Sequence, residues 1–230
     1  MSEYLFEAMC IGAHPDDVEI GMGATVAGMV RRGGRVVIVD LTNGEPTPHG
    51  TPEIRAAESA RAAAALGAER RTLSQPNRYL FDSVEARTEL AELMREFRPR
   101  LVFVPFAHDA HPDHVAASAI ATAARFYSKF TKTQMSGEPF YPERVYRYMA
   151  VHQRIVAEPS FIVDVTEDLP AKLEALKAYE SQFQANPANV GIVEMMQQQA
   201  AMWGALGRVL AGEPFFALEP VAVSTVEELL

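Results

Sequence analysis

The chain has 230 residues, 48% of them hydrophobic, and this length and composition suit one α/β core over residues 1–230. Its formal net charge of −9 argues against nucleic acid or an anionic membrane as a partner. A single cysteine, Cys10, excludes a disulfide framework and a thiolate metal cluster. Residues 1–4 lack the basic region of a signal peptide, and no apolar run approaches the roughly 18 residues of a membrane span, so we expect a cytoplasmic protein.

Alternating strands and helices are predicted along the first half of the chain. Apolar runs predict strands over residues 7–12, 35–41, 70–73 and 101–104. Apolar residues at helical spacing predict helices over residues 18–32, 53–66, 84–97 and 115–126. Such alternation calls for a parallel sheet with right-handed crossovers. We therefore expect a single Rossmann-like α/β domain, with a mostly parallel sheet in the order 3-2-1-4-5 and helices on both faces.

The pattern weakens beyond residue 127. Residues 128–142 are polar and interrupted by glycine and proline, which predicts a surface segment that either covers the site or meets another subunit. Further strands are expected over residues 145–151 and 161–165, and further helices over residues 169–183 and 190–210.

Two His-Pro-Asp segments follow strands that the predicted order makes neighbours. His14-Pro15-Asp16-Asp17 follows the first strand, and His111-Pro112-Asp113-His114 follows the fourth. The chain reverses direction between these two strands, so both segments should flank the crevice at the carboxyl edge of the sheet. A single His-Pro-Asp is ordinary helix-start chemistry. Two of them at adjacent strand ends indicate a metal site.

Three side chains have the composition of a catalytic metal site. His14 and Asp17 are three residues apart on a turn that enters a helix, and His111 and His114 share that spacing. Two imidazoles and one carboxylate leave a coordination position for water, as catalytic zinc sites do. We predict His14, Asp17 and His114 as ligands of Zn²⁺, with Fe²⁺ as an alternative because it accepts the same ligand set.

Asp16 and His111 lie beside these ligands and are available for proton transfer. A bound divalent ion lowers the pKa of its water from about 16 toward roughly 7. Asp16 is then the expected general base, because Asp17 is held by the metal. His111 is expected to donate to the oxyanion, a contribution of about 3 kcal/mol, and it could also protonate the leaving amine.

Other polar residues are expected around this centre. Glu19 and Asp113 are candidates to orient His114 or to balance His111. Arg55, near the start of the helix after a long loop, suits substrate hydroxyls or a carboxylate. Asn43 lies on that loop and is a further candidate for substrate binding.

Two other histidines and a glycine pair are interpreted without a role in the metal site. His49 and His152 are expected on surface loops. Gly21-x-Gly23 is half of a dinucleotide fingerprint, but the preceding pair of aspartates would repel a pyrophosphate at that helix entrance.

The two motifs together resemble those of the PIG-L/LmbE family of metal-dependent N-deacetylases. The resemblance extends to residues 40–45, to Arg55-x-x-Glu58, to Leu66-Gly67 and to residues 179–183. It implies the zinc ligands, the general base Asp16 and the oxyanion donor His111 named above, and a contact between Arg55 and the sugar.

The resemblance also implies a substrate and an assembly. Family members remove the acetyl group from N-acetylglucosamine units carried on different aglycones, and many are trimers or hexamers. The nearest branch acts on N-acetylglucosaminyl malate in bacillithiol synthesis, although Ala110 stands where that branch often carries arginine, which puts malate recognition in question.

We therefore expect a metal-dependent hydrolase that releases acetate from an N-acetylated amino sugar and that forms a homo-oligomer. Two alternatives stay open on the sequence alone. One is a metal-dependent amidase that acts on a non-sugar acyl amine. The other is a metal-binding or nucleotide-binding regulatory module without turnover.

Overall fold

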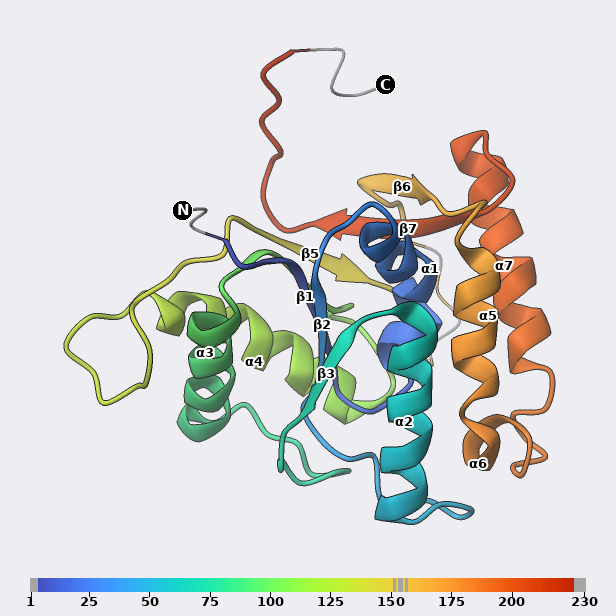
Figure 1. Ribbon diagram of the computed structural model, residues 1–230, viewed down its shortest axis with the longest axis horizontal. Coiled ribbons are helices and arrows are strands. Elements are labelled where there is room, and N and C mark those ends of the chain that lie inside the picture. The colour runs from blue at the N-terminus through green and yellow to red at the C-terminus, as the bar shows by residue number, and fades with distance from the viewer. Residues whose placement is uncertain (1–3, 151, 153–154, 156, 226–230) are drawn as a thin grey trace.

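A mixed sheet forms the centre of the computed structural model, which describes residues 4–150, 152, 155 and 157–225 (Figure 1). The absence of a signal-peptide basic region was argued from residues 1–4, of which 1–3 lie outside the described residues. Val151, the end of the strand predicted over residues 145–151, also lies outside them. Among those described, seven strands pair in the order β3-β2-β1-β4-β5-β7-β6, which confirms the predicted order of the first five. Their bounds are β1 Phe6–Gly12, β2 Val36–Asp40, β3 Glu69–Thr72, β4 Pro99–Pro105, β5 Arg144–Tyr148, β6 Phe161–Asp164 and β7 Gly212–Ala217.

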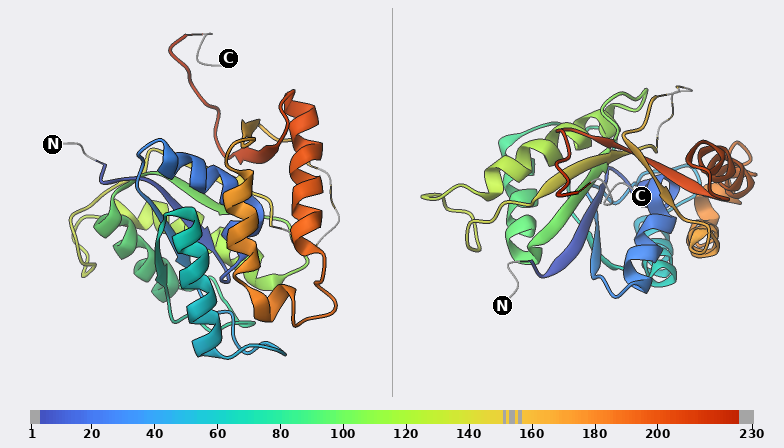
Figure 2. Two further views of the ribbon diagram at one scale, coloured as in Figure 1. Left: turned by 45° about the vertical axis from the view of Figure 1, so that its right-hand side comes forward. Right: turned by 90° about the horizontal axis from the view of Figure 1, so that it is seen from above.

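Helices cover both faces of the sheet, as expected (Figure 2). Helices α3 and α4 pack on one face, whereas α1, α2 and α5 pack on the other. The helices are α1 Asp17–Arg31, α2 Pro52–Leu66, α3 Val84–Phe97, α4 Pro112–Ser128, α5 Leu169–Lys177, α6 Glu180–Phe183 and α7 Ile192–Gly207. No helix among the described residues is long and apolar enough to cross a membrane.

Strand β1 divides the core between these two layers because successive side chains of a strand point to opposite faces. Met9 and Ile11 pack with the α3 and α4 side, while Ala8 and Cys10 pack with the α1 side. All four are fully buried. The parallel partners β2 and β4 flank β1, so the loops that leave the carboxyl ends of β1 and β4 are neighbours.

Gly21 owes its place to packing rather than to phosphate binding. A Cβ at this position would lie 2.2 Å from the ring of Tyr148. Tyr148 is buried and donates its hydroxyl to the carbonyl of Ile11 at 2.7 Å. The glycine therefore allows α1 to approach β5 closely, which accounts for half of the Gly21-x-Gly23 pattern without a nucleotide.

The carboxyl-terminal half departs from the expected elements in three places. Strand β7 was not predicted, because Pro214 interrupts its short run and proline is rare inside a sheet. It pairs antiparallel with both β5 and β6, so β6 lies at the edge and not beside β5. The predicted helix over 169–183 is divided into α5 and α6, and α7 is shorter than its predicted range 190–210.

The segment over residues 128–142 does not cover the strand ends. Its carbonyls at Ser128, Phe130 and Gly137 accept hydrogen bonds from the buried Arg95 of α3. It leaves the carboxyl end of α4, a helix of 17 residues that spans roughly 25 Å at 1.5 Å per residue, and Figure 1 shows it at the outer edge beside α3. The idea that this segment closes over the site is therefore wrong.

Candidate metal centre and active site

Asp17 fixes the turn between β1 and α1 and points one oxygen at a histidine of α4. Its Oδ2 accepts hydrogen bonds from the backbone N–H groups of Ala13 and His14, both at 2.9 Å. Its Oδ1 is left to face Nε2 of His114 at 3.2 Å. The residue is 4% exposed, and with Oδ2 held by the backbone its Oδ1 is aimed at a defined point.

Each of the two imidazoles uses one nitrogen for a carboxylate and leaves the other for that same point. Nε2 of His14 lies 3.1 Å from Asp113 Oδ2, and its Nδ1 lies 3.6 Å from Asp17 Oδ2. Nδ1 of His114 lies 2.6 Å from Asp109 Oδ2. His14, Asp17 and His114 thus each offer one ligand atom, and these atoms lie within 4.8 Å of one another.

This donor set fits a divalent ion. Two neutral imidazole nitrogens and one carboxylate oxygen suit catalytic Zn²⁺ or Fe²⁺. Carboxylates on the outer nitrogens of metal-binding histidines fix the tautomer and the ring orientation, and Asp113 and Asp109 occupy those positions here. The predicted ligands are therefore brought together as expected.

A second possible group, made of His14, His111 and Asp113, overlaps with the first. Its carboxylate is already engaged, because Asp113 accepts backbone N–H groups from Arg78 at 2.6 Å and Leu80 at 3.2 Å in addition to its contact with His14. Asp113 is thus better suited to hold His14 than to bind an ion, which favours the group with Asp17.

The charges of the site favour a cation at this point. Burial alone would lower the pKa of both histidines, but their carboxylate partners raise the pKa of His14 to about 10 and that of His114 to about 9. Burial would likewise raise the pKa of Asp17, yet the facing imidazoles hold it well below its usual range. A divalent ion would replace the imidazole protons, which is why metal binding at such sites releases protons.

Asp16 occupies the N-cap position of α1 in an unusual backbone conformation, and its side chain makes no capping hydrogen bond. Its φ of 110° and ψ of −24° lie in the left-handed region, which a residue with a Cβ rarely adopts. Burial raises the pKa of its carboxyl to about 7; the guanidinium of Arg55 opposes the rise, and the charge of Asp17 adds to it. Arg55 reaches Asp16 Oδ2 at 3.4 Å, and among the described residues no side chain donates to Oδ1.

His111 has its proton on the nitrogen that is free to face a substrate. Its Nδ1 accepts the backbone N–H of Asp113 at 3.2 Å. Burial, followed by the charges of His14 and His114, lowers the pKa of His111 to about 4, so the ring is neutral at pH 7. The proton of the neutral ring is therefore on Nε2, which makes it a hydrogen-bond donor.

Two expected residues have other contacts. We expected Glu19 to orient a histidine of the site, and this is corrected: its Oε1 accepts from Arg70 at 2.6 Å and from the hydroxyl of Tyr179 at 2.8 Å. Asn43 is exposed, and its Oδ1 accepts the backbone N–H of Glu45 at 2.9 Å. Neither contact reaches the histidines. Asp113 is in the site, but it holds His14 rather than His114.

Two residues near the site were missed by sequence reasoning. Asp109 holds His114, and it also accepts the backbone N–H of His152 at 2.8 Å. The ring of His152 is centred 5.3 Å from the rings of both His111 and His114, although the residue is exposed, as expected. The available signal was position: His152 follows β5, the next strand end along the same edge.

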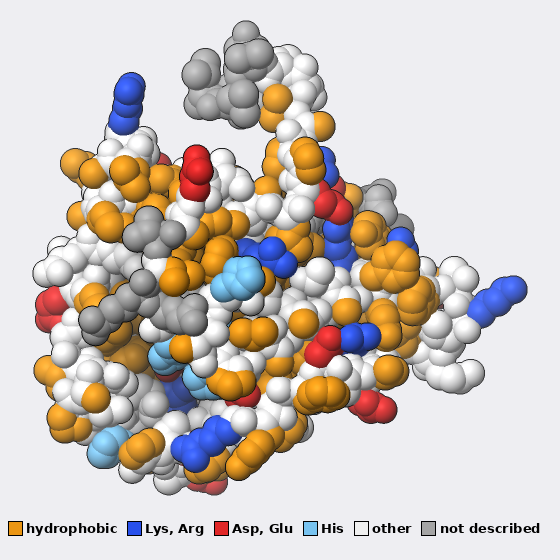
Figure 3. Space-filling model, turned by 180° about the vertical axis from the view of Figure 1, so that it is seen from behind, with side chains coloured by type: hydrophobic (Ala, Val, Ile, Leu, Met, Phe, Trp, Pro, Cys, Tyr) orange, Lys and Arg blue, Asp and Glu red, His pale blue; other side chains and the backbone are white. Residues whose placement is uncertain are grey.

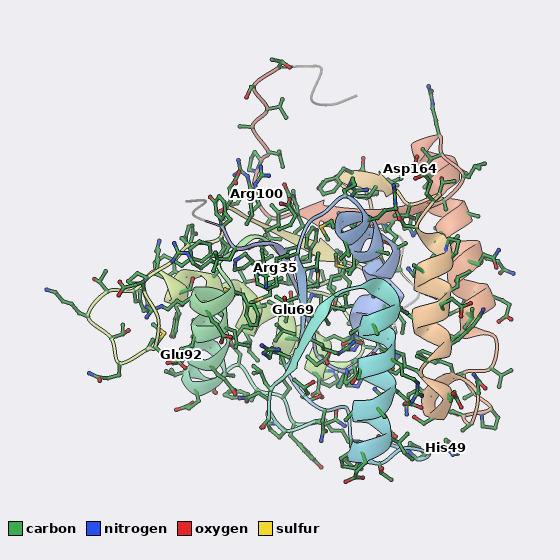
Figure 4. The ribbon with its side chains drawn as sticks, in the orientation of Figure 1. Arg35, His49, Glu69, Glu92, Arg100 and Asp164 are labelled. Atoms are coloured by element: carbon green, nitrogen blue, oxygen red, sulfur yellow. The ribbon has the colours of Figure 1, made fainter. Side chains whose placement is uncertain are left out.

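The site opens to the surface. Figure 3 shows histidine side chains beside a hollow on the face opposite to that of Figure 1, with basic and acidic side chains close by. His49 lies apart from this group, because Figure 4 places it on the loop before α2, where it is exposed. Its assignment to a surface loop is confirmed.

A family model described as PIG-L, GlcNAc-PI de-N-acetylase, matches residues 9–125, about half of the chain. This range contains both His-Pro-Asp segments and every residue of the site described so far except His152 and Tyr179. The chain therefore belongs to the PIG-L family, as the motifs predicted.

Proteins of known sequence and structure agree with this assignment. A diacetylchitobiose deacetylase of Thermococcus kodakarensis is 28% identical over 77% of this chain and 70% of its own length. A 1D-myo-inositol 2-acetamido-2-deoxy-alpha-D-glucopyranoside deacetylase of a Mycobacterium species is 28% identical over 81% of this chain and 77% of its own. The conserved protein TT1542 of Thermus thermophilus, known from a crystal structure, has 37% sequence identity to this chain and superposes with a TM-score of 0.87 over 96% of this chain and 98% of its own.

The same fold also carries other chemistry. A 4-carboxy-2-hydroxymuconate hydratase of Pseudomonas putida superposes with a TM-score of 0.81 over 95% of this chain and 98% of its own, at 19% identity. That likeness shows the fold alone. The reaction must therefore be inferred from the site and not from the sheet and helices.

Proposed function

We propose that this protein is a metal-dependent deacetylase that hydrolyses the amide of an N-acetylglucosamine-type substrate. One observation supports this above the others: two imidazole nitrogens and one carboxylate oxygen converge within 4.8 Å, with Asp16 and the Nε2 proton of His111 beside them. The names of the relatives support the acetamido sugar, since diacetylchitobiose and the inositol glycoside share an N-acetylglucosamine unit.

His14, Asp17 and His114 would hold the ion, for which we propose Zn²⁺ before Fe²⁺. When bound, such an ion acts as a Lewis acid toward the acetyl carbonyl and lowers the pKa of a water molecule. Asp113 and Asp109 keep the two imidazoles in the tautomers that leave His14 Nδ1 and His114 Nε2 free for it.

Asp16 and His111 then move the protons of the hydrolysis. Asp16 takes a proton from the attacking water at its free Oδ1 as the water oxygen bonds to the acyl carbon. His111 donates a hydrogen bond from Nε2 to the oxyanion that develops there. The C–N bond breaks, the nitrogen receives the proton held by Asp16, and the free amine leaves together with acetic acid, which releases its remaining proton to solvent and becomes acetate.

The sugar attached to the acetamido nitrogen distinguishes the proposed substrate from other acyl amines, and the aglycone of that sugar distinguishes one such substrate from another. The named relatives differ in their aglycone, an amino sugar in one and inositol in the other. N-acetylglucosaminyl malate remains the candidate that the sequence motifs suggest, with Asn43 a candidate contact on the loop after β2. A homo-oligomer, trimer or hexamer, is likewise proposed from family resemblance.

The test is release of free amine and acetate by the metal-loaded protein. The panel contains N-acetylglucosamine, N,N′-diacetylchitobiose and the inositol and malate glycosides, with N-acetylethanolamine as the non-sugar acyl amine. We expect turnover of at least one sugar, and an Asp16→Asn variant that keeps its metal while kcat falls by about 10²–10⁴-fold. Asp164→Asn, an exposed position on β6 (Figure 4), is the matched control.

Three results would contradict the proposal. Hydrolysis of the acyl amine but of no acetamido sugar would indicate a non-sugar amidase. Tight metal binding with no turnover of any compound would indicate a binding module. An Asp16→Asn variant with the wild-type kcat would remove Asp16 from the reaction.

A further inference from the structure

Helix α7 lies at the outer edge of the molecule, where one side of it packs on α5, β6 and β7 (Figure 1 and Figure 2). That buried side is formed by four residues: Met196, Ala200, Trp203 and Gly204. Three large apolar side chains of the same helix are not on that side. Met195 is 51% exposed, Met202 is 49% exposed and Leu206 is 67% exposed.

These three side chains form a continuous row along the helix. Met202 and Leu206 follow Met195 by seven and eleven residues, and at 3.6 residues per turn such spacings return to nearly the same face. We call Met195, Met202 and Leu206 the α7 stripe. A helix therefore presents an apolar row to the outside in addition to the one that it buries.

The exposed surface of α7 also lacks charge. No residue from 195 to 207 is charged, whereas α2 and α3 expose charged side chains such as Arg61 and Glu96. Exposed apolar side chains that are gathered together, and not scattered singly, mark an interaction site. The small side chains of Ala201 and Ala205, both exposed, would let the axis of a second helix approach closely.

The charges at the two ends of this surface indicate which partner fits it. Glu194 stands just before the uncharged run and Arg208 just after it, and both are exposed. They are fourteen positions apart in the sequence, which is roughly 21 Å at 1.5 Å per residue. The two side chains therefore cannot pair with each other within one chain.

A second copy of α7, antiparallel to the first, supplies the complement. Glu194 and Arg208 are equally far from Ala201 in the sequence, so a twofold axis near Ala201 brings Glu194 of one protomer beside Arg208 of its partner at both ends. The same axis packs the two α7 stripes together. A membrane surface fits less well, because interfacial helices carry Lys and Arg along their polar face, and α7 contains neither.

We propose that α7 forms a twofold interface between two copies of this chain, with the α7 stripe at its centre and a Glu194–Arg208 pair at each end. Such a contact belongs to the homo-oligomer proposed above and is independent of the reaction. It requires an assembly with a twofold axis, such as a dimer or a hexamer made of two trimers. A lone trimer has no such axis.

The mass of the assembly, measured by light scattering or sedimentation, gives the first test. We expect the wild type to have an even multiple of the chain mass of 25.3 kDa. Met202→Glu should have half of the wild-type mass, because it buries an unpaired charge in the contact. Glutamate is a good helix former and Met202 is exposed in the single chain, so circular dichroism should show a retained fold.

Gln197→Glu is the matched control. It adds the same charge to the same helix at an exposed position, about 140° around the helix from Met202 at 100° per residue. It should therefore keep the wild-type mass.

A charge exchange tests whether the partner is a second copy. Glu194→Arg and Arg208→Glu should each raise the dissociation constant of the contact by about 10-fold or more, because like charges then face each other. The double variant restores opposite charges across the contact and should return the constant to near its wild-type value. Since the two positions are too far apart to meet in one chain, this rescue requires a second copy.

Three results would overturn the proposal: a monomeric or trimeric wild type, a Met202→Glu variant with the wild-type mass, or a double variant that associates no better than the single ones. A monomeric wild type would leave the α7 stripe to a different partner. A protein that assembles through α7 but hydrolyses no acetamido sugar would contradict only the function proposed above.

Discussion

Helix α1 carries two clusters of buried charge that look alike in composition and differ in what they leave open. At its start, Asp17 faces His14 and His114, and one atom of each points to a shared location. In its middle, Glu213 of β7 accepts from Lys172 at 2.6 Å and from the hydroxyl of Thr25 at 2.6 Å. Convergence of ligand atoms, and not burial or charge, distinguishes a metal centre from a structural ion pair.

A kink explains why the second cluster exists. Met22 has the non-helical angles φ −153° and ψ 21° inside α1. Backbone N–H groups just after such a break lose their partners one turn earlier. Glu213 accepts two of them, from Ala24 at 3.3 Å and Thr25 at 2.7 Å. The carboxylate therefore caps the second half of the helix, and its oxygens are engaged within the protein.

The largest expected effect comes from removing a ligand of the first cluster. His114→Ala should abolish turnover and weaken metal binding by more than the roughly 10–100-fold that loss of an outer partner costs, because only one imidazole and one carboxylate remain. Competition with a chelator and metal analysis after dialysis measure this. His49→Ala, at an exposed loop, should leave both unchanged. Wild-type stoichiometry in His114→Ala would place the ion elsewhere.

Much of the first cluster could be predicted from the sequence because its signals are local. His14 and Asp17 lie within one turn, as do His111 and His114, and the strand order brings the two turns together. The alternation of apolar runs likewise predicted β1 to β4 and the helices between them. Short-range spacing and one topological rule were sufficient.

The contacts that sequence reasoning missed join segments that are distant in the sequence, and no spacing of residues predicts that these segments meet. Glu19 is five residues from His14, yet its partners are Arg70 and Tyr179, which tertiary packing brings to it. Glu213 and Thr25 are 188 residues apart, and the strand that carries Glu213 contains a proline. Proximity in sequence to a motif was therefore a poor guide to membership of the site.

The second cluster should affect stability and not metal binding. Lys172→Met leaves the Glu213 carboxylate buried without its cation, which costs about 3–5 kcal/mol of unfolding free energy. Lys177→Met, on the same helix but exposed and paired with Glu174 alone among the described residues, should cost less than about 1 kcal/mol. Denaturant unfolding measures both, and metal content should stay at the wild-type value.

A double variant separates the lost ion pair from lost packing. Glu213→Gln in the Lys172→Met background removes the uncompensated charge and keeps an amide that can still bond with Thr25. We expect it to recover a large part of the lost stability. Loss of metal without loss of stability in Lys172→Met would mean that the two clusters are coupled, and the distinction between them would fail.

The smallest expected effect tests how the first cluster holds its geometry. Asp109 Oδ1 accepts backbone N–H groups from Ala110 and His152, while Oδ2 faces Nδ1 of His114 at 2.6 Å. In Asp109→Asn the side-chain amide oxygen should keep the hydrogen bonds from the backbone N–H groups of Ala110 and His152. The amide NH₂ then faces Nδ1 of His114 and favours the His114 tautomer that has its proton on Nε2. That tautomer has no lone pair for the ion, and metal affinity should fall about 10–100-fold with the fold retained. An unchanged affinity, against Asp164→Asn as control, would show that orientation by Asp109 contributes nothing and that the converging atoms alone suffice.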